Sequence, residues 1–281
     1  MNTEDAALLA RKTWRTLEPL HGMIYFAPEA AKAYAELGLK GTQGYFASRS
    51  APMGAVSADV VIATFYNFNP ELVHAAIPSA WEATTPAALI AARLGAVDSA
   101  CRRVLGDDAV ASPEMARAAE LARTLAEEVS GHIEGRPLCA GHVNMEWPEA
   151  PHLVLWHAQS ILREYRGDAH IALLVTHGLS GIDALITHAA AGDVPASILQ
   201  SSRGWSDDQW ATAVASMCER GWVSEDTFAL TEWGAAQRQE IEDGTDGLST
   251  APYAALGEDG CAELRGLVRP WSKIFSEMLF R

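Results

Sequence analysis

The sequence predicts a mainly α-helical fold, in which an N-terminal helical domain packs on a C-terminal module that contains a small β-hairpin. Apolar residues recur at helical spacing through most of the chain, and Ser, Pro and Gly stand where helices would begin and end. From Pro195 onward the pattern changes to two helices, two short apolar runs and a longer helix. We therefore expect an N-terminal helical region over 1–150, central helices over 151–194, and the C-terminal module with a final helix over 195–281.

Composition places the chain among ordinary globular proteins. Of its 281 residues 49% are hydrophobic and 20% are charged, which suits one large domain or two modest ones. No apolar run reaches the roughly 18–20 residues that cross a bilayer, and the N-terminus lacks a basic segment followed by an apolar one. We expect a cytoplasmic protein with no membrane partner. The four cysteines are far apart, which predicts reduced, buried thiols and neither a disulfide nor a metal site: Cys101, Cys139, Cys218 and Cys261.

The N-terminal half is expected to consist of helices joined by loops. Two cover residues 3–37 and are separated at Pro19, because proline removes a helical hydrogen bond. Ser112 caps another, which begins at Pro113. The stretches 38–54 and 135–151 are predicted to be loops. The apolar stretch from Ala55 is expected to end as a helix at Asn69, before Pro70. Further helices are expected over 71–80, over 86–105 with Arg93 on its polar side, and over 113–133 for the helix that Ser112 caps.

The central stretch carries the most unusual pattern. Two helices are expected, over 152–176 and 181–191, and four charges stand inside the first of them. Arg166 lies on or beside the apolar stripe, and an unpaired buried charge costs several kcal/mol. Glu164, Asp168 or a ligand anion could supply the partner. The cluster is therefore either an internal ion network or the polar floor of a ligand pocket.

The C-terminal module has a recognisable order of elements. Ser206 caps a helix that runs to Arg220, the segment 222–230 indicates strand, turn and strand, and Thr231 opens a longer helix. With CERGWV followed by LTEWGAAQRQEIE, residues 195–246 resemble the winged helix of MarR-type regulators. This resemblance implies a DNA recognition helix just before Glu219.

Charge opposes DNA binding by this module. Residues 195–246 hold ten acidic residues and three arginines, a net charge of −7, and the whole chain carries −15. Tight binding to nucleic acid depends on cations that neutralise phosphates. DNA contacts are therefore expected only if the protein is a ligand-responsive, MarR-like transcriptional regulator, and they would fall to Arg203, Gln209 and Arg220.

The chain as a whole looks like a poorly characterised group of bacterial helix-turn-helix-like proteins. The segments that carry this resemblance are EPLHGMIYF, GYFASRSAPMG, FYNFNP, LREYRGDAH and RGWSDDQW, in this order. It supports the fold and implies no particular chemistry.

Polar side chains that alternate with aromatic ones suggest a ligand site. His21 and Tyr25 are one helical turn apart, Arg49 follows two aromatic residues, and binding pockets combine apolar walls with a few convergent polar groups. The leading hypothesis is a small-molecule-binding protein with low DNA affinity. Its ligand would be partly aromatic or apolar with a polar or anionic group, and would contact His21, Tyr25, Arg49, Asn67, Asn69, Trp156, Arg163, Arg166, Asp168 and His170.

Familiar catalytic and metal-binding motifs are missing, so no metal site is expected and any cofactor stays unknown. An enzyme of specialised metabolism without such a motif stays open as an alternative; His170 with Asp168, or His21, would then be the acid and base groups. The segment 261–281 is amphipathic and is expected either to form a homodimer or to pack on its own chain.

Overall fold

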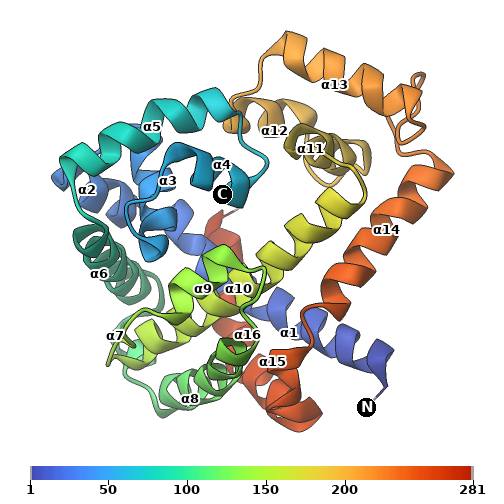
Figure 1. Ribbon diagram of the computed structural model, residues 1–281. Coiled ribbons are helices and arrows are strands. Elements are labelled where there is room, and N and C mark those ends of the chain that lie inside the picture. Colours follow the sequence, from blue (N-terminus) through green and yellow to red (C-terminus); the bar gives the residue numbers. More distant parts are fainter. Residues whose placement is uncertain (1, 280–281) are drawn as a thin grey trace. The chain divides into compact units, whose positions relative to one another are not determined.

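The computed structural model describes residues 2–279, with side chains up to Glu277. Within these residues the regular structure is helical, which confirms the mainly α prediction (Figure 1). The contacts between residues divide the chain into two units. Unit 1 comprises the residues up to Val56, Ser79–Ala169 and those from Asp246 onward, and unit 2 comprises Ser57–Pro78 and His170–Thr245. Three helices contribute residues to both units: α5 (Pro70–Ala83), α10 (Pro151–Thr176) and α14 (Glu232–Gly247).

Unit 1 is a helical array around an apolar core. The first half of α10 runs through it, and fully buried side chains from several helices meet there, among them Leu17, Leu125, Leu155, Leu162 and Phe275. The other helices of unit 1 are α1 (Thr3–Gly22), α2 (Pro28–Glu36), α3 (Gln43–Ser50), α6 (Pro86–Leu105), α7 (Asp107–Val110), α8 (Pro113–Glu128), α9 (Pro137–Val143), α15 (Ala251–Ala254) and α16 (Gly257–Leu279).

Three local predictions for unit 1 were wrong. Helix α1 continues through Pro19 to Gly22, because burial of Leu17 and Leu20 on either side outweighs the hydrogen bond that proline removes. Helices α3 and α9 occupy stretches that were expected to be loops. In α3, Gly44 is required by packing: a Cβ there would lie 2.8 Å from Cδ2 of Tyr34.

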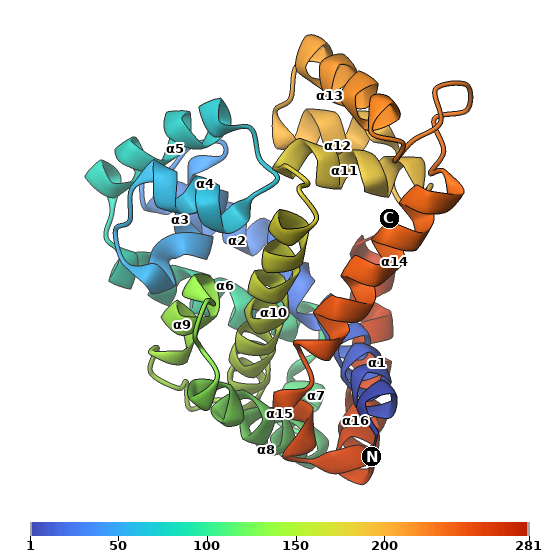
Figure 2. The ribbon, with the colours of Figure 1, turned by 45° about the vertical axis from the view of Figure 1, so that its right-hand side comes forward.

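The amphipathic C-terminal helix packs within its own chain. Helices α16 and α1 lie side by side (Figure 2). Leu264, Val268 and Phe275 of α16 are fully buried, and Ser272 Oγ donates a hydrogen bond to the carbonyl of Thr16. The side chains of Met278 and Leu279, which belong to the same apolar pattern, lie outside the described part. Much of the apolar face that suggested a dimer is therefore covered by α1.

Unit 2 is helical, and two of its consecutive helices are joined by a short turn. Its helices are α4 (Ala58–Phe65), α11 (Gly181–Ala190), α12 (Ala196–Arg203) and α13 (Asp207–Glu219), together with most of α5 and α14 and the end of α10. Gly204, at φ +75°, ends α12, and Ser206 begins α13 with a capping box that it forms with Gln209. Trp210, Met217 and Ile241 bury the apolar faces of α13 and α14. A short glycine-containing turn between two helices is the helix-turn-helix arrangement.

The predicted β-hairpin is wrong. In the described residues the only β-structure is one isolated antiparallel bridge, between Val223 and Leu230. Ser224 N–H donates to the carbonyl of Ala229 at 2.8 Å and Thr231 N–H to that of Trp222 at 3.1 Å, but Trp222 N–H, the next donor of a ladder, donates to Met217 of α13 at 2.9 Å. Because this donor is used by a helix, the two chain segments do not continue as a ladder. The resemblance to a MarR-type winged helix is not confirmed beyond the helix-turn-helix.

Two glycines mark close approaches of the backbone in unit 2. A Cβ on Gly181 would lie 1.9 Å from the carbonyl oxygen of Tyr66, and one on Gly234 would lie 2.1 Å from that of Trp222. Gly181 therefore admits the segment after α4 against the start of α11, and Gly234 admits Trp222 against the start of α14.

Among the described residues, no helix taken singly has the length and apolarity needed to span a bilayer. Helices α10 and α11 meet that criterion only when taken together across a sharp bend.

Candidate functional site

Five of the predicted ligand-binding residues come together in unit 1, around the ring of Tyr25. They are His21 and Tyr25 from α1 and the turn after it, Arg49 from α3, and Trp156 and Arg163 from α10. A sixth residue, Arg93 of α6, joins them. The guanidinium carbons of Arg49, Arg93 and Arg163 lie 5.8, 5.7 and 5.7 Å from the centre of the Tyr25 ring. We refer to these six residues as the Tyr25 cluster.

His21 connects the aromatic residues of the cluster through a directed chain of hydrogen bonds. Ser160 Oγ donates to the carbonyl of Trp156, so His21 Nδ1 donates to Ser160 Oγ at 2.9 Å. His21 Nε2 then accepts from the hydroxyl of Tyr25 at 3.0 Å. The imidazole stacks on Trp156 with 5.3 Å between ring centres. Burial, followed by the positive charge of Arg163, holds the pKa of His21 well below its ordinary value, so the ring is neutral at pH 7.

Two of the three arginines have acidic partners. Glu164 Oε1 lies 2.9 Å from Nη1 of Arg163 and 3.4 Å from Nη2 of Arg49, and Glu18 Oε1 lies 3.0 Å from Nε of Arg163. Burial opposes ionisation of Glu164, but Arg163 and Arg49 prevail and lower its pKa to about 2. Glu164 is therefore a buried carboxylate shared by two cations.

Arg93 is the buried cation without an acidic partner. Arg93 is only 5% exposed. Its guanidinium donates to the carbonyl of Ser48 at 2.8 Å and to the hydroxyl of Tyr25 at 3.4 Å. Its guanidinium carbon lies 5.2 Å from the ring centre of Trp156. Its Nε is buried and has no hydrogen-bond partner, and no carboxylate of residues 2–277 forms an ion pair with it. Arg93 therefore brings into the core a positive charge that two hydrogen bonds, cation–π contacts and the longer-range field of Glu164 face, without an ion pair.

A small cavity lies next to Arg93. Its volume is about 10 Å³, and its walls include Ser48, Pro52, Arg93, His142, Met145 and Trp156. A space of this size holds one water molecule. Burial lowers the pKa of His142 to about 4, although Glu164 acts in the opposite direction. The wall of the cavity at pH 7 therefore combines a permanent cation with a neutral imidazole.

Sequence reasoning missed Arg93, which it placed on the polar side of the helix over 86–105. The signal that would have found it is the spacing from Leu89 and Val97, four residues before and after, both of which are fully buried. Arg93 therefore stands on the apolar face of α6.

The two other predicted residues of unit 1 have partners from the protein. Arg166 Nη2 lies 2.8 Å from Asp246 Oδ1, and its guanidinium carbon lies 4.4 Å from the ring centre of Trp14. Asp246 also pairs with Arg11. Asp168 Oδ2 accepts the N–H of Cys139 at 2.9 Å, in the first turn of α9, and burial raises its pKa to about 7. None of these contacts connects Arg166 or Asp168 with a residue of the Tyr25 cluster.

The predicted residues of unit 2 hold its backbone together. Asn69 Nδ2 donates to the carbonyl of Gly204 at 2.9 Å and to Gln209 Oε1 at 3.0 Å, while its Oδ1 accepts from Glu71 N–H at 3.0 Å. The carbonyl of Asn67 accepts from the indole of Trp205 at 3.0 Å. Both asparagines therefore support the turn between α12 and α13.

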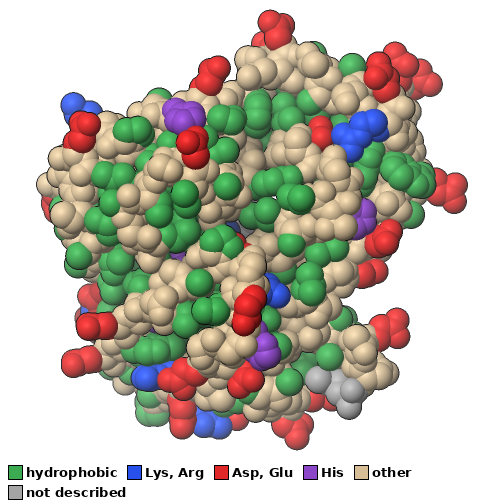
Figure 3. All heavy atoms as spheres, in the orientation of Figure 1, with side chains coloured by type: hydrophobic (Ala, Val, Ile, Leu, Met, Phe, Trp, Pro, Cys, Tyr) green, Lys and Arg blue, Asp and Glu red, His purple; other side chains and the backbone are tan. Residues whose placement is uncertain are grey.

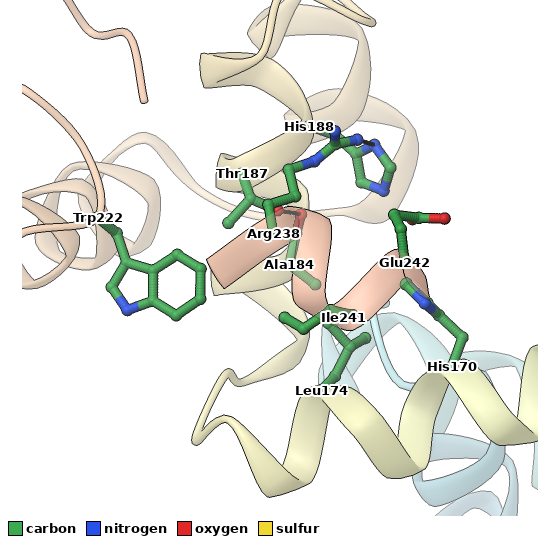
Figure 4. A pocket seen from close by; sticks show the side chains of 9 residues that line it. All are labelled: His170, Leu174, Ala184, Thr187, His188, Trp222, Arg238, Ile241 and Glu242. Carbon is green, nitrogen blue, oxygen red and sulfur yellow. Dashed lines mark hydrogen bonds between the residues drawn. The ribbon is translucent and has the colours of Figure 1, made fainter. Parts of the chain in front are cut away.

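His170 lies at a second small cavity, of about 10 Å³, which is drawn in Figure 4. His170 Nδ1 lies 3.0 Å from Thr245 Oγ1. On the same wall, Arg238 Nη2 lies 2.6 Å from Asp193 Oδ2 and 3.2 Å from His188 Nδ1. The cavity holds no more than one water, and no group of three or more metal-binding side chains occurs among the described residues.

The candidate DNA-binding residues also contact the protein. Arg220 donates to Asp183 Oδ2 at 3.1 Å and to the carbonyl of Gly178 at 2.8 Å, and Arg203 lies 4.8 Å from the ring centre of Phe68. Gln209 Oε1 accepts from the N–H of Ser206 at 3.0 Å. Unit 2 contains thirteen acidic residues, three arginines and no lysine. Figure 3 shows acidic side chains projecting from the part of the surface where α13 lies. The exposed acids of α13 itself are Asp207, Asp208 and Glu219.

The arrangement of α12, the turn at Gly204 and α13 defines the class of protein, a helix-turn-helix protein. The comparison with protein families agrees: the profile of a helix-turn-helix family matches residues 10–279, and the chain belongs to this family. No curated protein and no solved structure matches the chain.

Proposed function

We propose that this protein is a small-molecule-binding member of the helix-turn-helix family, which recognises an anionic group of its ligand at Arg93. The observation that carries the proposal is the buried guanidinium of Arg93, whose Nε and whose charge find no hydrogen-bond acceptor and no carboxylate partner among residues 2–277, and which has a small cavity beside it. Buried polar groups are paired in the great majority of cases, so such an exception calls for a ligand, an ion or a water.

The energetics favour an anion over a water. Desolvation of an unpaired buried ion costs several kcal/mol, and a cation–π contact returns about 2 kcal/mol when it is desolvated. A carboxylate or phosphate group would supply the remaining stabilisation through charge-assisted hydrogen bonds, which guanidinium groups form in a bidentate geometry. The rings of Tyr25 and Trp156 offer the neighbouring surface for an aromatic or apolar part of the ligand.

Ligand binding in this proposal requires the site to open. The present cavity holds one water, so a ligand of ordinary size displaces wall residues, of which Met145 is the adaptable one because its side chain is unbranched. The proposal includes a cytoplasmic location, which four cysteines outside any disulfide favour.

Thermal unfolding with small aromatic anions tests the proposal. Benzoate, salicylate and phenyl phosphate are compared with neutral benzamide on the wild type, on Arg93→Met and on Arg103→Met, whose arginine lies on the same helix but pairs with Glu29 at the surface. At least one anion raises Tm for the wild type and Arg103→Met, and not for Arg93→Met; benzamide has no effect. Arg93→Lys keeps the charge and retains a smaller shift. Equal shifts for wild type and Arg93→Met, or none with any of the anions, would show the proposal to be wrong.

A DNA-binding regulator is the second candidate, because the family and the α12–turn–α13 arrangement favour it. Fluorescence anisotropy with labelled fragments from around the protein's own gene, at about 150 mM salt, distinguishes the two. Specific binding that Thr212→Glu abolishes supports the regulator, since Thr212 is exposed on α13. Under the leading proposal only weak, salt-sensitive binding common to all sequences is seen, as the acidic surface predicts.

A further inference from the structure

One cavity of unit 2 lies beside α13. It is an open groove of about 820 Å³ between α13 and the segment 223–228. Its walls are mostly apolar, and its volume falls in the range of small-molecule sites. We name it the α13 groove and define it by Trp210, Val214, Cys218, Glu219, Glu225 and Phe228.

The charge of the α13 groove is of one sign. Glu219 and Glu225 are the only carboxylates among its lining residues, and no Lys, Arg or His lines it. Both glutamates are exposed, and neither forms an ion pair with another described residue. The neighbouring acids Asp208 and Asp226 are exposed too. A cation in the groove therefore meets attraction from several carboxylates and repulsion from no lining residue.

The aromatic wall of the groove is held in an unusual backbone conformation. Phe228 has φ +52°, which residues other than glycine rarely adopt. Its N–H donates to the carbonyl of Ser224 at 3.0 Å, and this bond keeps the turn in place. The turn presents the half-buried Phe228 to the groove opposite residues of α13, so two aromatic side chains, Trp210 and Phe228, line one space.

We propose that the α13 groove binds a hydrophobic organic cation. Trp210, Val214 and Phe228 contact its apolar body, the aromatic faces attract its positive charge, and Glu219 and Glu225 supply the counter-charge. This site is separate from the one proposed at Arg93 and selects the opposite charge. It also gives α13 an acidic, apolar surface that suits such a ligand better than it suits phosphates.

Two ions of nearly the same shape and opposite charge test the proposal: tetraphenylphosphonium and tetraphenylborate, each titrated calorimetrically into the full chain in a sodium buffer. Tetraphenylphosphonium binds, and tetraphenylborate binds at least tenfold more weakly. The double variant Glu219→Gln/Glu225→Gln lowers the affinity for the cation about three- to tenfold, as expected for exposed charge pairs. Equal affinities for the two ions, or no binding of the cation, overturn the proposal.

A matched pair of variants locates the site. Ala215→Trp fills the groove and lowers the affinity for tetraphenylphosphonium at least tenfold, whereas Ala236→Trp, which places the same side chain at an exposed position of α14 outside the lining residues, leaves it unchanged. Arg93→Met leaves it unchanged as well, which separates this site from the Tyr25 cluster. As an independent readout, the cation slows modification of Cys218, the one partly exposed cysteine, by a thiol reagent. Binding that survives Ala215→Trp, or that leaves the Cys218 rate unaltered, places the cation elsewhere and contradicts the proposal.

Discussion

Arg166 of α10 and Asp246 of α14 form a buried ion pair, with Nη2 and Oδ1 2.8 Å apart, across 80 residues of sequence. Asp246 also pairs with Arg11, so one carboxylate serves two cations. The sequence left open whether Glu164, Asp168 or a ligand anion neutralises Arg166. In the structure the partner of Arg166 is Asp246, which is none of these three. A ligand anion is therefore not needed at Arg166, and the argument for an anion site rests on Arg93.

Loss of the Asp246 carboxylate is expected to destabilise unit 1 strongly. Asp246→Asn leaves Arg166 buried without its anion, and breaking a buried pair from one side costs about 3–5 kcal/mol in the free energy of unfolding. Urea denaturation measures the loss. Asp243→Asn, one turn earlier on α14 and exposed, is the matched control and changes stability by less than about 0.5 kcal/mol. Equal effects of the two substitutions would contradict the assignment.

Gln159 is a residue whose replacement is expected to stabilise the protein. It lies on α10, is fully buried, and neither its Oε1 nor its Nε2 has a hydrogen-bond partner among the described residues. An unpaired buried amide costs about 1–3 kcal/mol, so Gln159→Met, which keeps the length of the side chain, raises the free energy of unfolding by about that amount. Exposed Gln239→Met serves as the control. A loss of stability in Gln159→Met would instead reveal a bound partner for the amide.

The buried histidines predict that the protein loses stability in acid. Burial, with a smaller contribution from His142, lowers the pKa of His157 to about 3, below the value near 6.5 of an unfolded chain. Between those two values the unfolded state binds a proton that the folded state does not, so this group's contribution is present above pH 6.5 and is lost as pH falls. In His157→Phe the dependence of unfolding free energy on pH near 5 becomes shallower by up to about 1.4 kcal/mol per pH unit. Urea titrations at pH 4.5, 5.5 and 7 measure it, and parallel curves for wild type and variant would refute the prediction.

A substitution at Gly181 tests how closely the backbone of Tyr66 approaches the start of α11. In Gly181→Ala the new methyl group meets the carbonyl oxygen of Tyr66, and relief of the overlap requires backbone movement. We expect a loss of about 3 kcal/mol, at the upper end for overpacking. Gly95 lies at an exposed position in the middle of α6, and no atom lies within 4 Å of the methyl group that Gly95→Ala adds. The free energy of unfolding of this variant rises by about 0.5–1 kcal/mol because alanine favours helix. Both are read from urea midpoints, and a neutral Gly181→Ala would show that the approach is looser than described.

The helices could be predicted where the signals were local. Ser180 and Ser206 cap α11 and α13 with their side chains, and these caps are visible in the sequence. The hairpin could not be judged in the same way, because Trp222 N–H, which a longer ladder would use, bonds to Met217 at the end of α13, and the carbonyl of Ser224 accepts from Phe228. Helix α3 was missed because its burial depends on other elements, as the close approach of Tyr34 to Gly44 shows, and no local signal reveals such contacts.

The candidate site was predictable in part for a similar reason. His21 and Tyr25 are one turn apart, so helical spacing alone places them together, and their hydrogen bond follows. The convergence of Arg49 with Arg163 depends on Glu164, which binds both, and no sequence pattern links α3 to α10. Arg93 was missed because charge was given more weight than its position among buried residues of α6.

The hydrogen bonds of Asn69 to Gly204 and Gln209 have a consequence for how this molecule can be dissected and recombined. A fragment that contains only α12, the turn and α13 lacks the asparagine that bonds to its turn, more than 130 residues upstream. The helix-turn-helix is therefore not an independent unit that can be transferred by itself to another protein. Exchanging it with that of a relative succeeds only when the stretch from Ser57 to Pro78 is exchanged at the same time.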